Sequence, residues 1–159
     1  MLTIMGIRDF LKDSAIVVGL KADTKKAVLE ELVSVLSDQG MLTDRQKMLE
    51  VLLARESLGS TGIGQGIAIP HGKSAVAKEL TAAIGISKTG VDFDALDDDK
   101  VYVIFLLVAP EEQASQHLKA LARVSALLKD KYFRKALINS EGAEDVIRVL
   151  EQEEKARKV

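Results

Sequence analysis

Residues 59–74 read GSTGIGQGIAIPHGKS, and they hold five of the chain's 11 glycines, one of its two prolines and one of its two histidines. Pro70 fixes its own φ and favours extended backbone at Ile69, so residues 67–69 are predicted to form a short buried strand. This strand places His71 at its end. A histidine held there, beside a loop rich in accessible amides, is typical of a site for phosphate chemistry.

Two common phosphate-binding motifs nearly match this stretch and are rejected on spacing. A P-loop, G-x-x-x-x-G-K-[ST], could end at Gly72, but its first glycine would fall at Ile67. A dinucleotide fingerprint, G-x-G-x-x-G, matches Gly62 and Gly64, but its third glycine would again fall at Ile67.

The segment TGIGQGIAIPHGK resembles the active-site segment of fructose/mannitol-type enzyme IIA domains of the bacterial phosphoenolpyruvate-dependent phosphotransferase system, including the nitrogen-regulatory enzyme IIA-like proteins. The resemblance implies that His71 carries a phosphoryl group on Nε2 while a backbone carbonyl holds Nδ1. It also implies that His117 lies close by and donates a hydrogen bond to the phosphoryl oxygens. Taken alone, His71 also fits a structural histidine at a strand end, and His117 fits a partly buried residue of a helix.

Other side chains near the glycine-rich stretch are candidates for holding phosphate. Arg55 has the matching family position, and a guanidinium can bind phosphate oxygens in bidentate fashion; Arg45 and Arg123 are less favoured. Lys73 could act as a point charge, although a solvated lysine is equally consistent. A phosphate-binding loop is expected from hydroxyl and backbone groups of Ser60, Thr61, Gly62, Gly64, Gly66 and Gly72.

Composition excludes several classes of protein. The 22 basic and 24 acidic residues nearly balance, which argues against general nucleic-acid binding. The chain has no cysteine, which excludes thiolate metal sites and suits the cytoplasm, where we expect the protein. No metal or cofactor is expected, since the acidic residues 92–99 lack the spacing of an EF-hand loop. The longest apolar stretch, 101–110, is too short to cross a bilayer, so no membrane insertion is expected.

The N-terminal half predicts a short helix, a strand and a helical hairpin. Residues 7–11 allow the short helix, and residues 15–18 predict the strand. Residues 24–39 carry an apolar stripe typical of a helix that Gly40 ends, and residues 43–55 predict a second helix that leads into the glycine-rich stretch.

The C-terminal half predicts two strands followed by helices. Residues 80–87 read as a strand with a turn after it at residues 88–90. Residues 101–109 are hydrophobic almost throughout, as suits a central strand covered on both faces. Helices are expected at residues 110–128, 132–138 and 143–150, and the charged residues 151–159 are expected to fray.

Helices interleaved with a few strands predict an α/β fold, a single layered domain with helices on both faces of a sheet. The resemblance implies a mixed sheet. The enzyme IIA-type domain is expected over residues 1–153, with residues 154–159 as a charged tail.

The resemblance implies a phosphotransferase that works through a phosphohistidine. The donor would be a histidine-containing phosphocarrier protein, and the acceptor an enzyme IIB component that serves fructose- or mannitol-type sugar uptake. An alternative is a regulatory nitrogen-related protein whose phosphorylation state controls its binding to other proteins. A ligand-binding module without turnover is a third hypothesis.

Overall fold

The computed structural model of the protein describes residues 6–157, and its centre is a mixed six-stranded sheet. The strands are β1 (Leu11–Val18), β2 (Gly62–Gly64), β3 (Ile67–Ala68), β4 (His71–Lys73), β5 (Thr81–Val91) and β6 (Val101–Ala109). They lie in the order β1-β5-β6-β3-β2, with β4 also paired to β6. β5 and β6 are antiparallel, whereas β1 is parallel to β5, and both β3 and β4 are parallel to β6.

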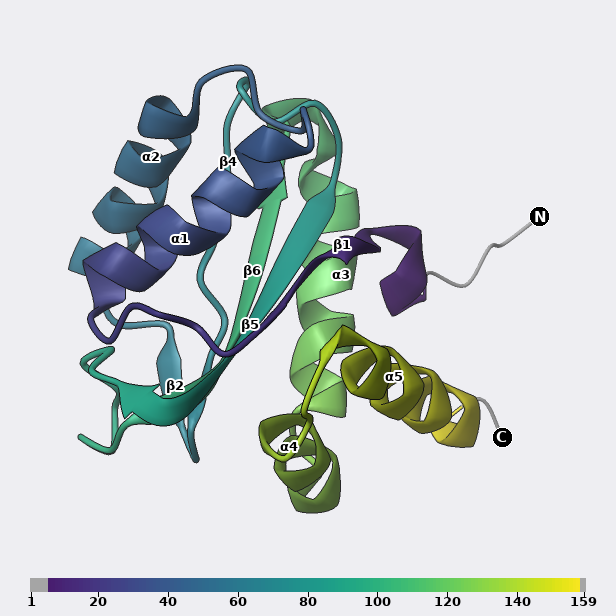
Figure 1. The fold of residues 1–159 in the computed structure, drawn as a ribbon. Helices are drawn as coiled ribbons and strands as arrows, with labels where there is room; N and C mark the ends of the chain where they lie inside the picture. Colours follow the sequence, from purple (N-terminus) through teal and green to yellow (C-terminus); the bar gives the residue numbers. More distant parts are fainter. Residues whose placement is uncertain (1–5, 158–159) are drawn as a thin grey trace.

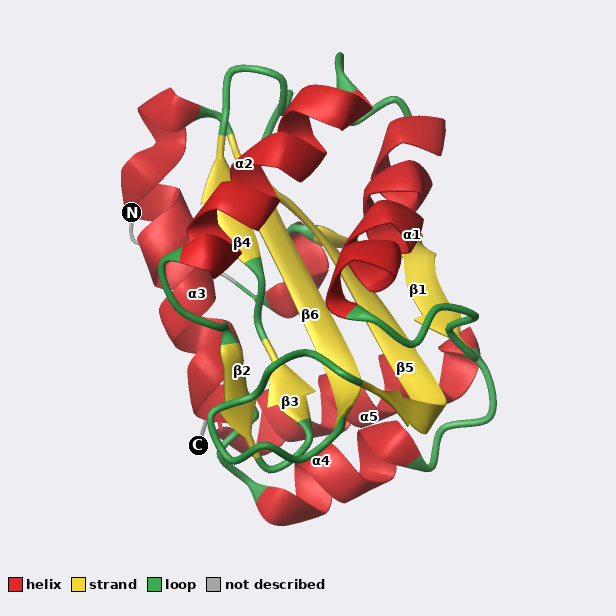
Figure 2. Cartoon of the chain, turned by 90° about the vertical axis from the view of Figure 1, so that its left-hand side faces the viewer, coloured by secondary structure: helices red, strands yellow, loops and turns green. Residues whose placement is uncertain are grey.

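Helices cover both faces of this sheet (Figure 1). The α-helices are α1 (Lys25–Asp38), α2 (Arg45–Ser57), α3 (Ala114–Leu127), α4 (Lys131–Ile138) and α5 (Ala143–Arg157), and short 3-10 turns form η1 (Ile7–Asp9) and η2 (Glu111–Gln113). The α1–α2 hairpin packs over β5 and β4 on one face, and α3, α4 and α5 pack on the other (Figure 2). The predicted α/β class with a mixed, doubly covered sheet is confirmed.

The predicted helical hairpin and central strand are confirmed because local signals define them. Thr24 caps α1 by accepting a hydrogen bond from the Ala27 amide, and the apolar stripe of α1 is buried. The side chain of Asp44 caps α2 in the same way. Eight of the nine residues of β6 are buried, as expected for a strand between two helical layers.

The turn expected at residues 88–90 is wrong, because β5 continues through it to Val91. The register between β5 and β6 shifts between Ile86 and Val91, and Gly90 has a φ of 95° within this irregular part of the strand. The polar residues that suggested a turn therefore mark a bulge in a long strand.

The ends of three other elements also differ from expectation. The short N-terminal helix is only the 3-10 turn η1, and β1 already begins at Leu11. After Pro110 the chain forms η2, so α3 begins at Ala114 rather than at the proline. The expected fraying from residue 151 is wrong for the described residues, because α5 continues to Arg157 and buries Glu154.

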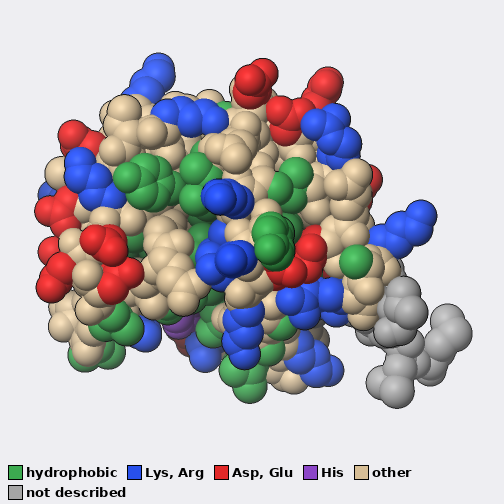
Figure 3. Space-filling view, turned by 90° about the horizontal axis from the view of Figure 1, so that it is seen from below, with side chains coloured by type: hydrophobic (Ala, Val, Ile, Leu, Met, Phe, Trp, Pro, Cys, Tyr) green, Lys and Arg blue, Asp and Glu red, His purple; other side chains and the backbone are tan. Residues whose placement is uncertain are grey.

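Charges of both signs are present on the surface. Seen from below, the face where α4 lies carries groups of lysine and arginine side chains together with groups of acidic side chains (Figure 3). In the described residues, no helix combines the length and hydropathy that a membrane span requires.

Candidate functional site

His71 is the first residue of β4, where it lies opposite Leu107 of β6. Its Nδ1 is 2.8 Å from the carbonyl oxygen of Ile69. Because a carbonyl only accepts hydrogen bonds, Nδ1 carries the ring proton and Nε2 keeps its lone pair. The side chain is half-buried. The local fold therefore engages Nδ1 with the backbone and leaves Nε2 outside this contact.

His117 lies in the first turns of α3, beside His71. The two ring centroids are 5.9 Å apart with an interplanar angle of 49°, although 45 residues of chain lie between the two histidines. His117 is only 5% exposed, and its Nε2 has no hydrogen-bond partner. Burial lowers the pKa of His117 below 6.5, a hydrogen bond with the Leu107 backbone opposes this, and charge on His71 and Lys73 lowers the pKa further.

Both histidines line one groove of about 550 Å³ between α2, β4 and α3. The other lining residues are Val51, Arg55, Gly72, Lys73, Ala114, Leu118 and Leu121. Leu118 is 68% exposed at this rim, so the groove offers apolar surface around two imidazoles and two cations. Gly72 brings α2 close to β4, because a Cβ there would lie 3.0 Å from a methyl group of Val51.

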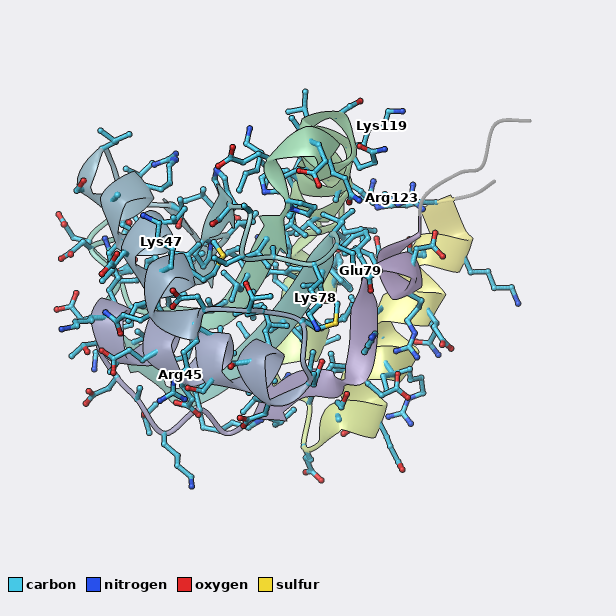
Figure 4. All side chains as sticks on the ribbon, turned by 90° about the horizontal axis from the view of Figure 1, so that it is seen from above. Arg45, Lys47, Lys78, Glu79, Lys119 and Arg123 are labelled. Carbon is cyan, nitrogen blue, oxygen red and sulfur yellow. The ribbon has the colours of Figure 1, made fainter. Side chains whose placement is uncertain are left out.

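Arg55 lies in the last turn of α2 at this groove, as expected from its sequence position. One guanidinium nitrogen, Nη1, donates a 2.9 Å hydrogen bond to the carbonyl of Gly59, which uses one of the five donors of the side chain. The other two arginines considered are not part of the groove. Arg123 binds Glu154 at 3.1 Å, and Arg45 lies on α2 at a different part of the surface (Figure 4).

The first residues of the expected phosphate-binding loop are engaged in contacts within the protein. The amide of Thr61 donates to Glu56 at 3.0 Å, and its hydroxyl donates to the same carboxylate. The Ser60 hydroxyl donates to the Phe93 carbonyl at 2.9 Å and accepts from the Gly62 amide at 3.0 Å. These groups stabilise the connection from α2 to β2 and do not line the groove.

Gly64 and Gly66 lie in the β2–β3 hairpin, far along the sheet from His71. Gly64 packs against Asp97, and the Gly66 carbonyl accepts hydrogen bonds from the amides of Tyr102 and Val103. Ile67 of β3 pairs with Val103 of β6, whereas His71 of β4 pairs with Leu107. These two partners are four residues apart, which corresponds to about 13 Å along β6. Of the six expected loop residues, the structure brings only Gly72 to the groove.

The N-terminus of α3 is a part of the groove that the sequence did not reveal. Ala114 lines the groove, and α3 has no side-chain cap at its N-terminus. The positive end of the helix dipole therefore favours an anion there. The sequence suggested that the helix starts at Pro110, which would have placed this end elsewhere. Within residues 6–157, no three acidic or histidine side chains form a metal-binding group.

Comparison with known proteins identifies the family of this fold and site. A family model described as "Phosphoenolpyruvate-dependent sugar phosphotransferase system, EIIA 2" matches residues 9–153. The fructose-specific EIIABC component from Bacillus subtilis strain 168 is 40% identical over 151 residues, which are 95% of this chain and 24% of that protein. The chain thus spans about a quarter of that relative. A nitrogen regulatory protein from Bradyrhizobium diazoefficiens is 38% identical over 146 residues, 92% of this chain and 95% of that protein.

Solved structures agree with these relatives. Nitrogen regulatory protein IIA-Ntr from Neisseria meningitidis has a TM-score of 0.84 and 37% identity, and the match covers 91% of this chain and 98% of that one. Enzyme IIAMTL from Escherichia coli, solved in complex with phosphorylated enzyme IIBMTL, shares the fold at a TM-score of 0.76 and 21% identity, over 90% of this chain and 99% of that one. This chain belongs to the EIIA 2 family of the phosphoenolpyruvate-dependent sugar phosphotransferase system.

Proposed function

We propose that His71 accepts a phosphoryl group on Nε2 and passes it on. The observation that carries the proposal is the 2.8 Å contact between Nδ1 and the Ile69 carbonyl, which leaves Nε2 as the nucleophile at an open groove. The donor is the phosphohistidine of a histidine-containing phosphocarrier protein that docks on the apolar rim around Leu118. A cytoplasmic location is part of this proposal.

The transfer exchanges one nitrogen–phosphorus bond for another. The Nε2 lone pair of His71 attacks phosphorus in line, the bond to the donor imidazole breaks, and that imidazole keeps the bonding electron pair. The protein supplies position and positive charge to the phosphoryl oxygens. In this groove the charge comes from Arg55, from Lys73 and from the N-terminus of α3.

His117 changes its protonation state during this reaction. Burial lowers the pKa of its ring, which favours the neutral form in the free protein, and its Nε2 has no partner. A phosphoryl group on His71 brings negative charge beside this ring, which raises its pKa and favours protonation. The protonated Nε2 then donates a hydrogen bond to a phosphoryl oxygen. His117 thus stabilises the phosphorylated form without taking part in bond formation.

Intact-mass spectrometry tests the chemistry after incubation with phosphoenolpyruvate, enzyme I and the phosphocarrier protein. The wild type is expected to gain one acid-labile phosphate, the His71→Ala variant none, and the His117→Ala variant the same phosphate more slowly. A folded His71→Ala variant that still carries a phosphohistidine would rule the proposal out.

For the acceptor we propose an enzyme IIB component of a fructose- or mannitol-type sugar system. The fructose-specific relative and the structural neighbour solved with phosphorylated enzyme IIBMTL support this acceptor. The second candidate is a regulatory protein of the nitrogen-related type, and the two nitrogen regulatory relatives favour it. In both roles the same phosphohistidine is formed, and only its use differs.

Transfer of label from the ³²P-labelled protein separates the two roles. Loss of label to a purified fructose- or mannitol-type IIB domain within seconds supports transport. Retention of label in the presence of each IIB domain, together with a partner that binds only one phosphorylation state, supports regulation.

A further inference from the structure

Glu56 is a buried carboxylate that lies next to Arg55 in the chain and does not line the groove. It is 6% exposed, whereas carboxylates are rarely buried unless a partner compensates their charge. We propose that Glu56 is a positioning residue that sets the tautomer of His71. This inference rests on the proposed function, because it concerns how the nucleophile is prepared.

The carboxylate of Glu56 joins three segments. Both its oxygens accept from Thr61, one from the amide at 3.0 Å and the other from the hydroxyl. Lys25, at the start of α1, places its Nζ 3.3 Å from the same carboxylate and 5.2 Å from the centre of the Phe93 ring. Thr61 is itself buried, so water does not compete for these bonds. The connection after α2 is thereby fixed to both helices of the hairpin.

The hydrogen bonds continue from Thr61 to the reacting ring. The Thr61 carbonyl accepts from the Ile69 amide at 3.1 Å, and the Ile69 carbonyl accepts from Nδ1 of His71 at 2.8 Å. The amide and carbonyl of Ile69 belong to different peptide groups, so the coupling is one of position rather than of polarisation. Glu56 therefore acts on His71 by fixing where the Ile69 carbonyl lies.

The pairing of β3 and β4 with β6 also holds the chain on either side of Ile69, and the bond to Thr61 is the contact that ties Ile69 itself to the segment after α2. The chain between α2 and β2 has no regular hydrogen-bonded structure, and Pro70, which follows Ile69, has no amide hydrogen to fix the next peptide group. If Thr61 shifts, the Ile69 carbonyl shifts with it and Nδ1 loses its acceptor. The ring then divides between its two tautomers, and the form protonated on Nε2 has no lone pair on that nitrogen with which to attack phosphorus.

Two substitutions remove these bonds with little change of shape. Glu56→Gln replaces one of the two acceptor oxygens by an amide nitrogen, and Thr61→Val removes the hydroxyl donor. Thr61→Ser keeps both donors and serves as the conservative variant. Glu154→Gln is the matched control, because Glu154 is also buried but binds Ile7 and Arg123 instead.

The test reads the tautomer of His71 by ¹⁵N NMR in the unphosphorylated protein and, separately, the rate of phosphorylation. In Glu56→Gln and Thr61→Val we expect a mixture of tautomers and phosphorylation slowed by about tenfold. Thr61→Ser and Glu154→Gln are expected to match the wild type in both measurements.

Folded Glu56→Gln and Thr61→Val proteins with the wild-type tautomer would overturn the inference, as would an equal effect of Glu154→Gln. The NMR measurement needs no phosphoryl donor. If the wild type is never phosphorylated, the proposed function fails, while the tautomer of these variants still decides the role of Glu56.

Discussion

The two histidine rings differ in their contact with water, and this difference agrees with the two roles proposed for them. His71 is half-buried with its Nδ1 held by a carbonyl, whereas His117 is buried and its Nε2 has no partner. A nucleophile needs access to its partner protein, while a group that responds to new charge needs a low-dielectric surrounding. The geometry therefore suits His71 for bond formation and His117 for stabilising the product.

The stability of the protein is expected to fall as the pH drops through the range in which histidine titrates. Burial lowers the pKa of His117 below 6.5 in the folded state, so the unfolded chain binds this proton more readily. The stabilisation that the neutral His117 ring gives to the folded state is complete above pH 6.5. It is lost as the pH falls from 6.5 toward the pKa of His117 in the folded state. Urea unfolding at about pH 7.5 and about pH 5.5 measures how much unfolding free energy each protein loses on acidification, and this loss should be smaller for His117→Gln than for the wild type. Equal losses of unfolding free energy would contradict this.

Arg55→Lys is expected to slow phosphorylation by about tenfold or more without unfolding the protein. Lysine keeps the positive charge but loses the planar fork, which here spans from the Gly59 carbonyl to the groove. Stopped assays of phosphate incorporation measure the rate. Arg45→Lys is the control, because Arg45 lies outside the groove; a similar loss in both variants would show that Arg55 has no special role.

At the scale of elements, the close packing of α2 against β4 shapes the groove. Gly72 makes this contact possible, since a Cβ there would meet a methyl of Val51 at 3.0 Å and the Met48 methyl at 3.3 Å. Both neighbours lie on α2, which also carries Arg55. Any shift of α2 therefore changes the distance between the guanidinium and His71.

Gly72→Ala is expected to lower the free energy of unfolding by about 1–3 kcal/mol, because the added methyl overpacks the interface. Gly142→Ala is the control, since a Cβ at that position, just before α5, meets nothing within 4 Å; its cost is expected to stay below about 1 kcal/mol. Urea unfolding measures both, and phosphorylation should be slower only in the Gly72 variant. An unchanged stability of Gly72→Ala would contradict the packing argument.

Local signals explain which elements the sequence predicted well. The helices α1, α2 and α4 have apolar stripes and capping side chains close in the chain, and β6 is nearly all apolar. The strands β2 and β4 were missed because each has only three residues and forms through pairing with distant segments. The Lys88-Thr89-Gly90 sequence suits a turn, and only pairing across β5 and β6 makes it a bulge.

Only part of the candidate site could be predicted, because the sequence does not show the contacts between segments that lie far apart in the chain. The resemblance led to His71, His117 and Arg55, and the structure places all three at one groove. The phosphate-binding loop was misplaced because glycine content does not show which acceptors the amides already have. The Gln65 amide donates to Asp97 at 3.0 Å, and the Thr61 amide donates to Glu56. Only the fold brings these carboxylates to the amides.

At the scale of the whole molecule, Glu154 joins the two ends of the described chain. It accepts from the Ile7 amide at 3.0 Å and from Arg123 on α3 at 3.1 Å. This carboxylate lies one residue beyond the stretch that the family model matches, in the part of α5 that was expected to be a tail. The attachment of the end of α5 to η1 and α3 thus depends on a residue outside the family match.

Glu154→Ala is expected to destabilise the fold by about 1–3 kcal/mol, because it leaves a buried amide and a half-buried guanidinium without their acceptor. Glu153→Ala removes only an ion pair with Arg157 on the same helix, and its cost is expected to stay below about 1 kcal/mol. Thermal unfolding compares the two, and equal midpoints would show that the end of α5 adds nothing to the fold.

The position of the phosphate on the imidazole ring shows which nitrogen of which histidine attacks phosphorus. The wild type would be labelled with ¹⁵N at histidine, phosphorylated by its donor chain and examined by ¹H–¹⁵N and ³¹P NMR. We expect a single phosphate on Nε2 of His71, with the proton of Nδ1 retained. A phosphate on Nδ1 of His71, or on His117, would contradict it.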